Sequence, residues 1–424
     1  MKKLKALLLS CMLLLPILRV TACAQEAGNS FAIRDVRVFD GDATIARANV
    51  IVRDGRIVAA GKGVAIPAGL EVIDGKGRTL LPGLIDSHVH VFPGAQADAL
   101  RFGVTTELDM FNLSHEFSRW RAQRESLGSV TDADTWSAGT GVTVRGGHPN
   151  QWVPDDMPRL LNADGAQSFI ASRVAEGSDF IKLIIEDNAA IDPAQPLPTL
   201  SRSEACACIA AARALGKLTI AHVTNQANAR TALECGVNGL AHTIVDAPMS
   251  AELVQLARER KVFAVSTVSL LAATPGAALG SLLGSANARL LSASQQGSMS
   301  RTTPLVHAGQ LAVALENLRR LHTAGVAVLA GTDAPVPGTA HGVSMHGEMA
   351  LLVKAGFTPV EALAAATSVP ADVFGLGDRG RVKPGYRGDL LLVEGDPTKD
   401  VADTLRIDRI WKNGYVVDRG VAVH

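Results

Sequence analysis

The stretch Leu81-Pro82-Gly83-Leu84-Ile85-Asp86-Ser87-His88-Val89-His90 combines an apolar run with two histidines that lie two positions apart. Alternate residues of a β-strand point to the same face, so His88 and His90 can face one centre if the run forms a buried strand. Two neutral imidazoles on one rigid edge suit a divalent transition metal. Taken alone, the pair could equally be part of a polar surface, so the rest of the chain has to decide.

Further apolar runs follow this stretch, and most are separated by amphipathic segments such as Arg202–Leu215 and Gln226–Glu234. Alternation of strands and helices with buried apolar strands is typical of a parallel sheet. The eight candidate strands are Leu80–Asp86, Val104–Met110, Thr135–Ala138, Phe180–Ile184, Leu218–Ala221, Gly239–His242, Val262–Ser266 and Ala327–Ala330. Eight such units within residues 81–375 predict an α/β fold, a closed (β/α)8 TIM barrel. The alternative is an open doubly wound sheet, but no glycine-rich nucleotide-binding fingerprint follows a strand.

Both ends of the mature chain contain short β-branched runs and turn dipeptides, among them Asp54-Gly55 and Asn413-Gly414. These patterns predict an antiparallel sheet in residues 31–80 and further strands in residues 380–422. We expect the two ends to build one small β-sandwich-like domain together. Between the seventh and eighth barrel strands, residues 268–310 form a long connection rich in Gly, Ala and Ser, which is expected to be a lid over the barrel.

The first 24 residues have the order of a secretory signal peptide, with three early lysines, an apolar run from Ala6 to Leu18 and small residues at the end. The run is short for a membrane span. Ala22-Cys23-Ala24 suits ordinary cleavage, whereas Val20-Thr21-Ala22-Cys23 resembles a bacterial lipobox with a lipid anchor on Cys23. The expected location is therefore the periplasm or outer membrane of a bacterium, or otherwise the exterior of the cell.

Composition excludes an electrostatic nucleic-acid binder, because 41 Lys and Arg balance 41 Asp and Glu. Removal of the signal leaves 37 basic against 41 acidic residues, so the mature chain is slightly acidic. Cys206, Cys208 and Cys235 then remain, an odd and sparse set that does not indicate a disulfide framework. We expect them to be small buried side chains. A homo-oligomer is possible.

Three more candidate ligands stand where a predicted strand closes: His222 in Thr219–His222, His242 in Gly239–His242, and Asp333 just after Ala327–Ala330. In a barrel these positions form the catalytic rim, so the side chains should converge on metal. Lys182 also lies toward a strand end. It is either a buried, ion-paired lysine or a neutral amine of lowered pKa, which could take up carbon dioxide as a carbamate that bridges two metals.

At this point the chain resembles the amidohydrolase superfamily over nearly everything after the signal. The resemblance rests on the stretch Pro82–His90, Gly103-Val104-Thr105-Thr106, Phe180-Ile181-Lys182, His222, His242, Gly331-Thr332-Asp333 and the tail Gly380–Leu390. It implies two divalent metal ions, expected to be zinc, with His88, His90 and Asp333 on the more buried ion. It further implies His222 and His242 on the second ion and carbamylated Lys182 between them.

Within the superfamily the chain is most similar to the imidazolonepropionase-related and prolidase-like branch. That branch includes Xaa-Pro and other dipeptidases, N-acyl amino acid hydrolases and ochratoxin-degrading amidases. Lys182 favours the binuclear, peptidase-like side, because imidazolonepropionases are typically mononuclear and lack it. The segment Ile185-Glu186-Asp187 departs from the small, Gly-rich sequence often found after this lysine.

The resemblance implies hydrolysis of an amide bond in a dipeptide or N-acyl amino acid by a hydroxide held between the two ions. Asp333, with His242 and His148, forms the expected catalytic set, in which Asp333 passes a proton from water to the leaving amine. Arg145, His148 and His346 are the expected substrate contacts, while Glu107 and Asp109 are candidates to support the ligands. The alternatives are a lactone, cyclic-amide or phosphotriester hydrolase on the same centre, or a non-catalytic barrel.

Overall fold

The computed structural model describes residues 29–113, 116–153, 156–272, 287–301 and 307–420. The predicted signal peptide with Cys23 and two parts of the predicted lid, residues 273–286 and 302–306, lie outside the described residues. Within the described ranges, no helix combines the length and the apolar character needed to cross a membrane.

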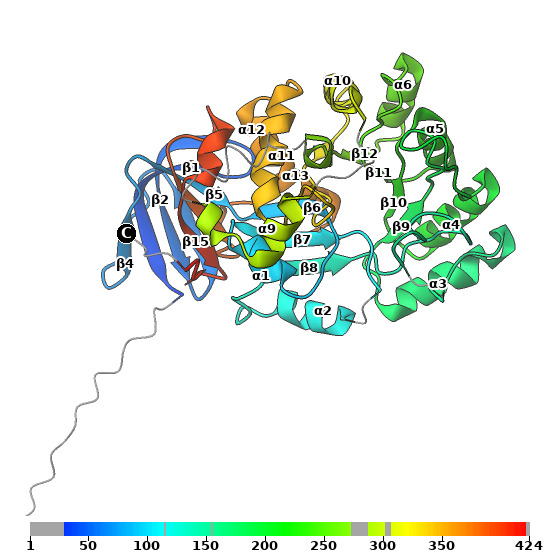
Figure 1. Cartoon of the computed structure of the whole chain (residues 1–424). Coiled ribbons are helices and arrows are strands. Elements are labelled where there is room, and N and C mark those ends of the chain that lie inside the picture. Colours follow the sequence, from blue (N-terminus) through cyan, green and yellow to red (C-terminus); the bar gives the residue numbers. More distant parts are fainter. Residues whose placement is uncertain (1–28, 114–115, 154–155, 273–286, 302–306, 421–424) are drawn as a thin grey trace, which may run out of the picture.

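Both ends of the chain contribute to one eight-stranded sheet, which lies at one end of the molecule (Figure 1). Its strand order is β16-β15-β14-β5-β1-β2-β3, and β4 pairs with β1. The strands are β1 (Phe31–Phe39), β2 (Thr44–Arg53), β3 (Arg56–Gly61), β4 (Glu71–Asp74), β5 (Arg78–Pro82), β14 (Leu390–Glu394), β15 (Ile407–Lys412) and β16 (Tyr415–Val416). The chain ends meet where β14 runs antiparallel to β5 with Leu391 opposite Leu81.

The purely antiparallel sheet predicted for residues 31–80 is wrong in part, because β1 pairs in parallel with β4 and β5. The loop of residues 62–70 returns the chain to the start of β1, so β4 runs in the same direction as β1. Antiparallel pairing holds for β1 with β2 and for β2 with β3. One face of the sheet packs around Phe31, Val50, Leu392 and Trp411, all of which are buried.

Eight parallel strands form the second part of the fold, one for each strand predicted from the sequence. They are β6 (Leu84–Val89), β7 (Val104–Asp109), β8 (Asp134–Ser137), β9 (Ile181–Ile184), β10 (Thr219–His222), β11 (Gly239–Ala241), β12 (Phe263–Val265) and β13 (Val328–Leu329). Their pairing gives a three-stranded sheet, β6-β7-β8, and a five-stranded sheet, β13-β12-β11-β10-β9. Backbone hydrogen bonds cross both seams, from Asp179 N to Ser137 O at 2.8 Å and from Ser87 N to Ala330 O at 2.9 Å.

The first predicted strand, Leu80–Asp86, is divided between the two parts of the fold. Leu80 and Leu81 belong to β5 of the eight-stranded sheet, and the parallel strand β6 starts only at Leu84. Gly83 separates them: a Cβ there would lie 2.2 Å from Thr105 Oγ1, so only glycine fits against β7. A continuous apolar run therefore serves two sheets, a division that hydrophobic patterning alone does not reveal.

Helices follow most of the parallel strands, and α3 to α6 lie beside β9 to β12 at the other end of the molecule (Figure 1). The helices are α1 (Ala95–Leu100), α2 (Phe117–Glu125), α3 (Ala166–Glu176), α4 (Arg202–Ala214), α5 (Gln226–Cys235), α6 (Ala251–Glu259), α7 (Ser269–Ala272), α9 (Ala293–Met299), α10 (Gln310–Thr323), α11 (Val343–Lys354), α12 (Pro359–Ala365) and α13 (Ser368–Val373). Short 3-10 turns are η1 (Ala163–Gly165), η2 (Ala288–Leu290) and η3 (Val401–Leu405). The start of α4 is fixed by a capping box between Ser201 and Glu204.

A buried ion cluster ties the eight-stranded sheet to the parallel strands. Lys412 of β15 is fully buried, and its Nζ donates to Asp134 of β8 at 2.8 Å and to Asp389 at 2.9 Å. Arg379 donates to the same Asp134 carboxylate. Two cations that are distant in sequence, Lys412 and Arg379, thus pair with the buried Asp134 carboxylate and link the two parts of the fold.

The cysteine prediction is wrong for two of the three residues. Cys206 of α4 and Cys235 of α5 form a disulfide, whereas Cys208 is free and buried as expected. Positions two apart on a helix point to different faces, so Cys206 can face α5 while Cys208 faces the core. This pairing could not be predicted from the sequence, because 29 residues separate the two cysteines.

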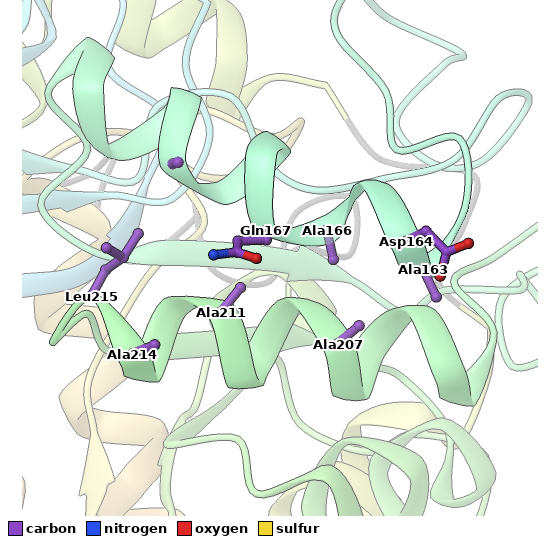
Figure 2. A pocket seen from close by; sticks show the side chains of 9 residues that line it. Ala163, Asp164, Ala166, Gln167, Ala207, Ala211, Ala214 and Leu215 are labelled. Carbon is purple, nitrogen blue, oxygen red and sulfur yellow. The ribbon is translucent and has the colours of Figure 1, made fainter.

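The described parts of the predicted lid pack near the loop that follows β13. Ser298 Oγ of α9 donates to Pro335 O at 2.9 Å, and Gln295 Nε2 donates to His341 O at 2.8 Å. Elsewhere, a groove of about 490 Å³ lies between α3 and α4 (Figure 2). Alanines of both helices line most of it, and none of the candidate site residues does.

Candidate metal centre

The structure brings the six predicted metal ligands to the carboxyl ends of the parallel strands. His88 lies within β6, Lys182 within β9 and His222 at the end of β10, and His90, His242 and Asp333 lie in the loops that follow their strands. Parallel strands present these ends at one edge, so residues more than two hundred positions apart meet there. Among the four predicted histidine ligands, His88 is buried at residue level and the other three are partly buried, and Lys182 and Asp333 are buried.

Four predicted ligands and His148 form a continuous row of imidazole rings. Ring centroids are 5.5 Å apart for His90 and His88, and 4.6 Å apart for His88 and His242. The row continues at 4.2 Å from His242 to His222 and at 4.8 Å from His222 to His148. The predicted catalytic residue His148 therefore adjoins the predicted metal ligands directly.

Asp333 lies against this row and contacts three of its rings. Its Oδ1 is 3.1 Å from His90 Nε2 and 3.2 Å from His88 Nε2, and its Oδ2 is 3.9 Å from His242 Nδ1. One ligand atom each from His88, His242 and Asp333 lie within 4.8 Å of one another, a spacing that could hold a metal ion. This triad includes His242, which the resemblance had placed on the second ion. Asp333 therefore lies beside residues predicted to bind each of the two ions.

The donor atoms fit divalent metal. His90 Nδ1 lies 3.2 Å from the Phe111 carbonyl, which can only accept, so a proton on Nδ1 would leave the Nε2 lone pair for a metal ion bound beside Asp333 Oδ1, 3.1 Å away. Among the described residues neither ring nitrogen of His88 makes a hydrogen bond of good geometry, although both are buried and Nε2 lies 3.2 Å from Asp333 Oδ1. Orphaned buried nitrogens are costly unless something binds them, and a metal ion supplies the missing partner.

Burial also keeps these imidazoles in the form that binds metal. It lowers the pKa of His88, His222 and His148 to about 3 and holds that of His242 well below its usual value. The rings are therefore neutral near pH 7 and keep a lone pair. Although burial raises it, the pKa of Asp333 is held well below its usual value by His88 and His242, so this carboxyl is ionised.

Lys182 has the character that a carbamate requires. Its side chain is almost fully buried, and burial lowers its pKa from 10.5 to about 7, against the opposing charges of Asp333 and Asp109. A large part of the amine is therefore neutral near pH 7.5, and only the neutral amine reacts with carbon dioxide. The alternative of a permanently ion-paired lysine is not supported, because no salt bridge to Lys182 occurs among the described residues.

Local backbone features explain how Asp333 reaches the cluster. A Cβ at Gly331 would lie 2.9 Å from His88 N and 2.6 Å from Val265 Cγ1, so only glycine permits this close approach to β6. Thr332 then donates its hydroxyl to Asp86 Oδ2 at 2.6 Å, and Asp333 N donates to His88 O at 2.8 Å. Asp333 itself has φ 58, a left-handed conformation that is uncommon for a non-glycine residue and often marks functional sites.

Three supporting residues were not assigned a role from the sequence. Thr267 Oγ1 lies 3.0 Å from His242 Nδ1, and the loop that carries it is held by Glu348, which accepts from Val268 N at 2.9 Å. Glu186 is buried, accepts from Thr224 Oγ1 at 2.6 Å, and places Oε2 3.6 Å from His222 Nε2. The unusual Ile185-Glu186-Asp187 segment was the one signal that could have pointed to it.

The predicted substrate contacts differ in their placement. Gly147 packs so closely against Pro198 and Thr143 that a Cβ would lie 2.7 Å from Pro198 O, and Thr143 Oγ1 donates to His148 O at 2.6 Å. These contacts hold His148 in the ring row. Arg145 lies in the exposed turn just before Gly147.

His346 is not part of the cluster. Its Nδ1 lies 2.9 Å from Thr404 Oγ1 and its Nε2 2.9 Å from Phe102 O, so the buried ring links α11 to η3 and the end of α1. The predicted substrate contact is not supported by this geometry. Of the two candidate supporting carboxylates, Asp109 accepts from Val91 N at 2.9 Å beside the cluster, whereas Glu107 pairs with His341 Nδ1 at 2.6 Å.

The sequence is similar to those of known proteins. The amidohydrolase family model matches residues 79–417. The imidazolonepropionase of Streptomyces griseus is 27% identical over 394 residues, which cover 87% of this chain and 92% of that protein. Other similarities are partial: the imidazolonepropionase of Deinococcus deserti is 41% identical over 100 residues, and the match covers 25% of its length. An adenine deaminase of Lysinibacillus sphaericus matches over 12% of its length.

Solved structures of similar fold cover nearly the whole chain. A Xaa-Pro dipeptidase with bound methionine has a TM-score of 0.72 at 21% identity, covering 92% of this chain and 100% of that one. Molinate hydrolase has a TM-score of 0.74 at 20% identity, covering 93% and 96%. The ochratoxinase of A. niger has a TM-score of 0.70 at 18% identity, covering 92% and 96%. At these identities the likeness establishes the fold.

Proposed function

Because the chain belongs to the amidohydrolase family, we propose that it is an exported hydrolase with two divalent metal ions, of zinc, that cleaves the amide bond of a dipeptide or N-acyl amino acid. Members of this family hydrolyse carbon–nitrogen bonds. The observation that carries the proposal is the row of five imidazoles, four of which burial keeps neutral, beside ionised Asp333 and buried Lys182. Its chemistry argues against a barrel kept only for binding.

Bound metal would lower the pKa of water and polarise the carbonyl that is to be cleaved. The residues proposed to hold it are His88, His90, His222, His242 and Asp333, with Lys182 as a bridging carbamate. Glu186 would orient His222, since a carboxylate behind a ligating imidazole fixes its tautomer and orientation.

Asp333 is the proposed proton carrier. It is ionised and lies at the centre of the cluster, so it can accept a proton from the attacking water and return it to the leaving amine. His148 adjoins the metal ligands as a neutral ring, so it can donate one hydrogen bond to the oxygen that becomes negative. His242, held by Thr267, faces the same space, and the exposed guanidinium of Arg145 is proposed to meet a substrate carboxylate.

Two further parts of the proposal concern the fold and the location. We propose that the two parallel sheets act as one closed (β/α)8 barrel, supported by the backbone hydrogen bonds across both seams. The Cys206–Cys235 disulfide supports export, because such bonds persist in oxidising compartments. A lipid anchor on Cys23 and assembly into a homo-oligomer are kept as proposals on the sequence.

The test is a hydrolysis screen with metal-replete protein across dipeptides, N-acyl amino acids, lactones and phosphotriesters, comparing kcat/KM. We expect the amides to be hydrolysed best, EDTA to abolish turnover, and zinc with bicarbonate to restore it. Asp333→Asn should lower kcat by about a hundredfold or more, in line with the loss of a general acid–base group. Turnover of phosphotriesters alone would overturn the amide assignment.

A second candidate is hydrolysis of a cyclic amide. It is favoured by the similarity to imidazolonepropionase over most of both chains. The same screen separates the two candidates once cyclic amides are included. Hydrolysis of a cyclic amide opens the ring and gives one product, whereas hydrolysis of a linear amide gives two.

A further inference from the structure

Thr267 has a strained backbone conformation beside the proposed metal site. Its φ of 44 lies in the left-handed region, where a β-branched residue is a genuine outlier. Such a conformation is unfavourable and persists only where the surrounding contacts enforce it. Thr267 is buried, and its Oγ1 lies 3.0 Å from Nδ1 of the predicted ligand His242. The strained residue therefore contacts the cluster directly.

Glu348 of α11 supplies the contacts that hold this conformation. Its side chain is buried, and its carboxylate accepts hydrogen bonds from Val268 N at 2.9 Å and from Ser269 N at 2.7 Å. The hydroxyls of Ser266 and Ser269 donate to the same carboxylate. The residues on both sides of Thr267 are thus bound to one side chain, which leaves the backbone between them little freedom.

The charge of Glu348 serves this loop and no ion pair. Within the described ranges, no lysine or arginine forms a salt bridge with Glu348, and hydrogen bonds from residues 266–269 satisfy it instead. A buried carboxylate is costly, so an apolar side chain would suit the packing of α11 alone better than glutamate does. The loop is also bound from its other side, because Thr243, the residue after His242, donates its hydroxyl to Ser266 O at 2.6 Å.

The position of Thr267 affects which nitrogen of His242 carries the proton. His242 Nδ1 has two oxygen neighbours, Thr267 Oγ1 at 3.0 Å and Asp333 Oδ2 at 3.9 Å. Because ionised Asp333 can only accept hydrogen bonds, a proton on Nδ1 is favoured over a lone pair that would face a negative charge. Thr267 Oγ1 lies at hydrogen-bond distance and can accept this proton. In the neutral ring, Nε2 then keeps the lone pair that a metal ion requires.

We propose that Glu348 is a positioning residue for the metal site, which holds Thr267 against His242 and so fixes the proton on Nδ1 and leaves Nε2 for metal. This inference rests on the proposed function, in which His242 binds one of the two ions. Among the described residues Glu348 forms hydrogen bonds to the loop and to no predicted ligand, so it acts through Thr267. Loss of such a supporting group typically weakens metal binding by about tenfold to a hundredfold.

The experiment compares the wild type with four variants. Glu348→Gln keeps the size of the side chain but places an amide donor among the donors of the loop. Thr267→Val keeps the shape and the branching but lacks the hydroxyl, whereas Thr267→Ser keeps the hydroxyl. His346→Leu is the control, because His346 is buried two residues earlier in α11 and is bound to Thr404 and Phe102 instead.

Two measurements are made on each protein. NMR spectra of metal-free protein labelled with 15N at histidine report which nitrogen of His242 carries the proton, and His242→Gln assigns its signals. A competition titration with a chelator gives the zinc affinity. We expect the wild type, Thr267→Ser and His346→Leu to have the proton on Nδ1 and equal zinc affinities. Thr267→Val and Glu348→Gln should mix the two proton positions and bind zinc about tenfold to a hundredfold more weakly.

Three results would overturn the inference. A wild-type His242 with its proton on Nε2 would show that Nδ1 is the nitrogen left for metal. An unchanged proton position in Thr267→Val would show that the hydroxyl does not fix it. A change in Thr267→Val that is absent from Glu348→Gln would remove the role of Glu348. If Glu348→Gln does not fold, Ser269→Ala replaces it and removes one hydrogen bond to the carboxylate, so a His242 proton and zinc affinity like those of the wild type would refute that role.

Failure of the proposed function gives a different result. If the wild type binds no zinc, the proposed metal centre fails, and the spectra of the metal-free proteins still decide whether Glu348 and Thr267 fix the proton of His242. If the wild type binds zinc but hydrolyses no amide, the amide assignment fails, and both measurements decide the inference as before.

Discussion

Replacement of Lys182 by methionine should stabilise the metal-free protein at low pH while destroying its metal site. Burial lowers the pKa of Lys182 from 10.5 to about 7. At 1.36 kcal/mol per pKa unit, this shift corresponds to at most about 5 kcal/mol. The free energy of unfolding is lower by this amount when the amine is charged in the folded protein. Methionine is similar in length and carries no charge, so it removes this cost.

The pH dependence follows from proton binding. Between about pH 7 and 10.5 the unfolded chain binds the lysine proton and the folded chain does not, so the stability of the wild type rises with pH across this window. Below pH 7 both states are protonated and the full cost is present. The advantage of Lys182→Met should therefore be largest at pH 6 and vanish near pH 10.5.

The assay is thermal unfolding of protein treated with EDTA, at pH 6 and pH 10. For a chain of this size 1 kcal/mol shifts Tm by about 1 °C, so Lys182→Met should gain up to about 5 °C at pH 6. The exposed Lys354 provides the control, and Lys354→Met should shift Tm equally little at both pH values. A Lys182→Met shift that is the same at pH 6 and pH 10 would refute the reasoning. In metal-replete preparations, the same variant should bind less zinc per chain.

Three other predictions test separate parts of the structure. Glu186→Gln should weaken zinc binding by about tenfold to a hundredfold in a competition titration with a chelator, because His222 loses its orienting carboxylate. The control Asp187→Asn should change the zinc affinity little. Equal zinc affinities of Glu186→Gln and the wild type would show that Glu186 does not support the site. Replacing both Cys206 and Cys235 by alanine opens a loop of 29 residues and should lower the free energy of unfolding by about 3–4 kcal/mol. The variant should therefore have a lower Tm than the wild type. Reducing agent should lower the Tm of the wild type but not that of the variant. His346→Leu should lower Tm through the loss of two buried hydrogen bonds, with kcat/KM unchanged on every substrate. A large rise in KM without a change in Tm would instead show that His346 contacts the substrate.

Much of the cluster could be predicted because the residues that form it follow a simple rule of parallel sheets. His222 and Asp333 stand at or just after the carboxyl ends of short apolar strands, and those ends meet at one edge whatever the loops do. His88 and His90 add the two-residue spacing of a single strand. Such positions depend on local periodicity, which one sequence contains.

Other features depend on distant partners and could not be predicted in this way. Cys206 and Cys235 pair only because α4 and α5 pack side by side. The sequence predicts His346 as a substrate contact, but tertiary packing gives both its nitrogens partners from Phe102 and Thr404. Burial of such a ring is a property of its neighbours and not of its own segment.

The sequence by itself determined the order of most strands and helices and the identity of the side chains that gather at the carboxyl ends of the parallel strands. Both follow from local periodicity and from residue chemistry. Only the tertiary structure decided that Leu81 ends one sheet while Leu84 begins another, that His148 adjoins His222, and that Trp152 stands exposed beside the ring row. These features depend on which surfaces pack together. The pKa of a side chain, its hydrogen-bond partners and its exposure are all set by the residues that surround it in the folded protein.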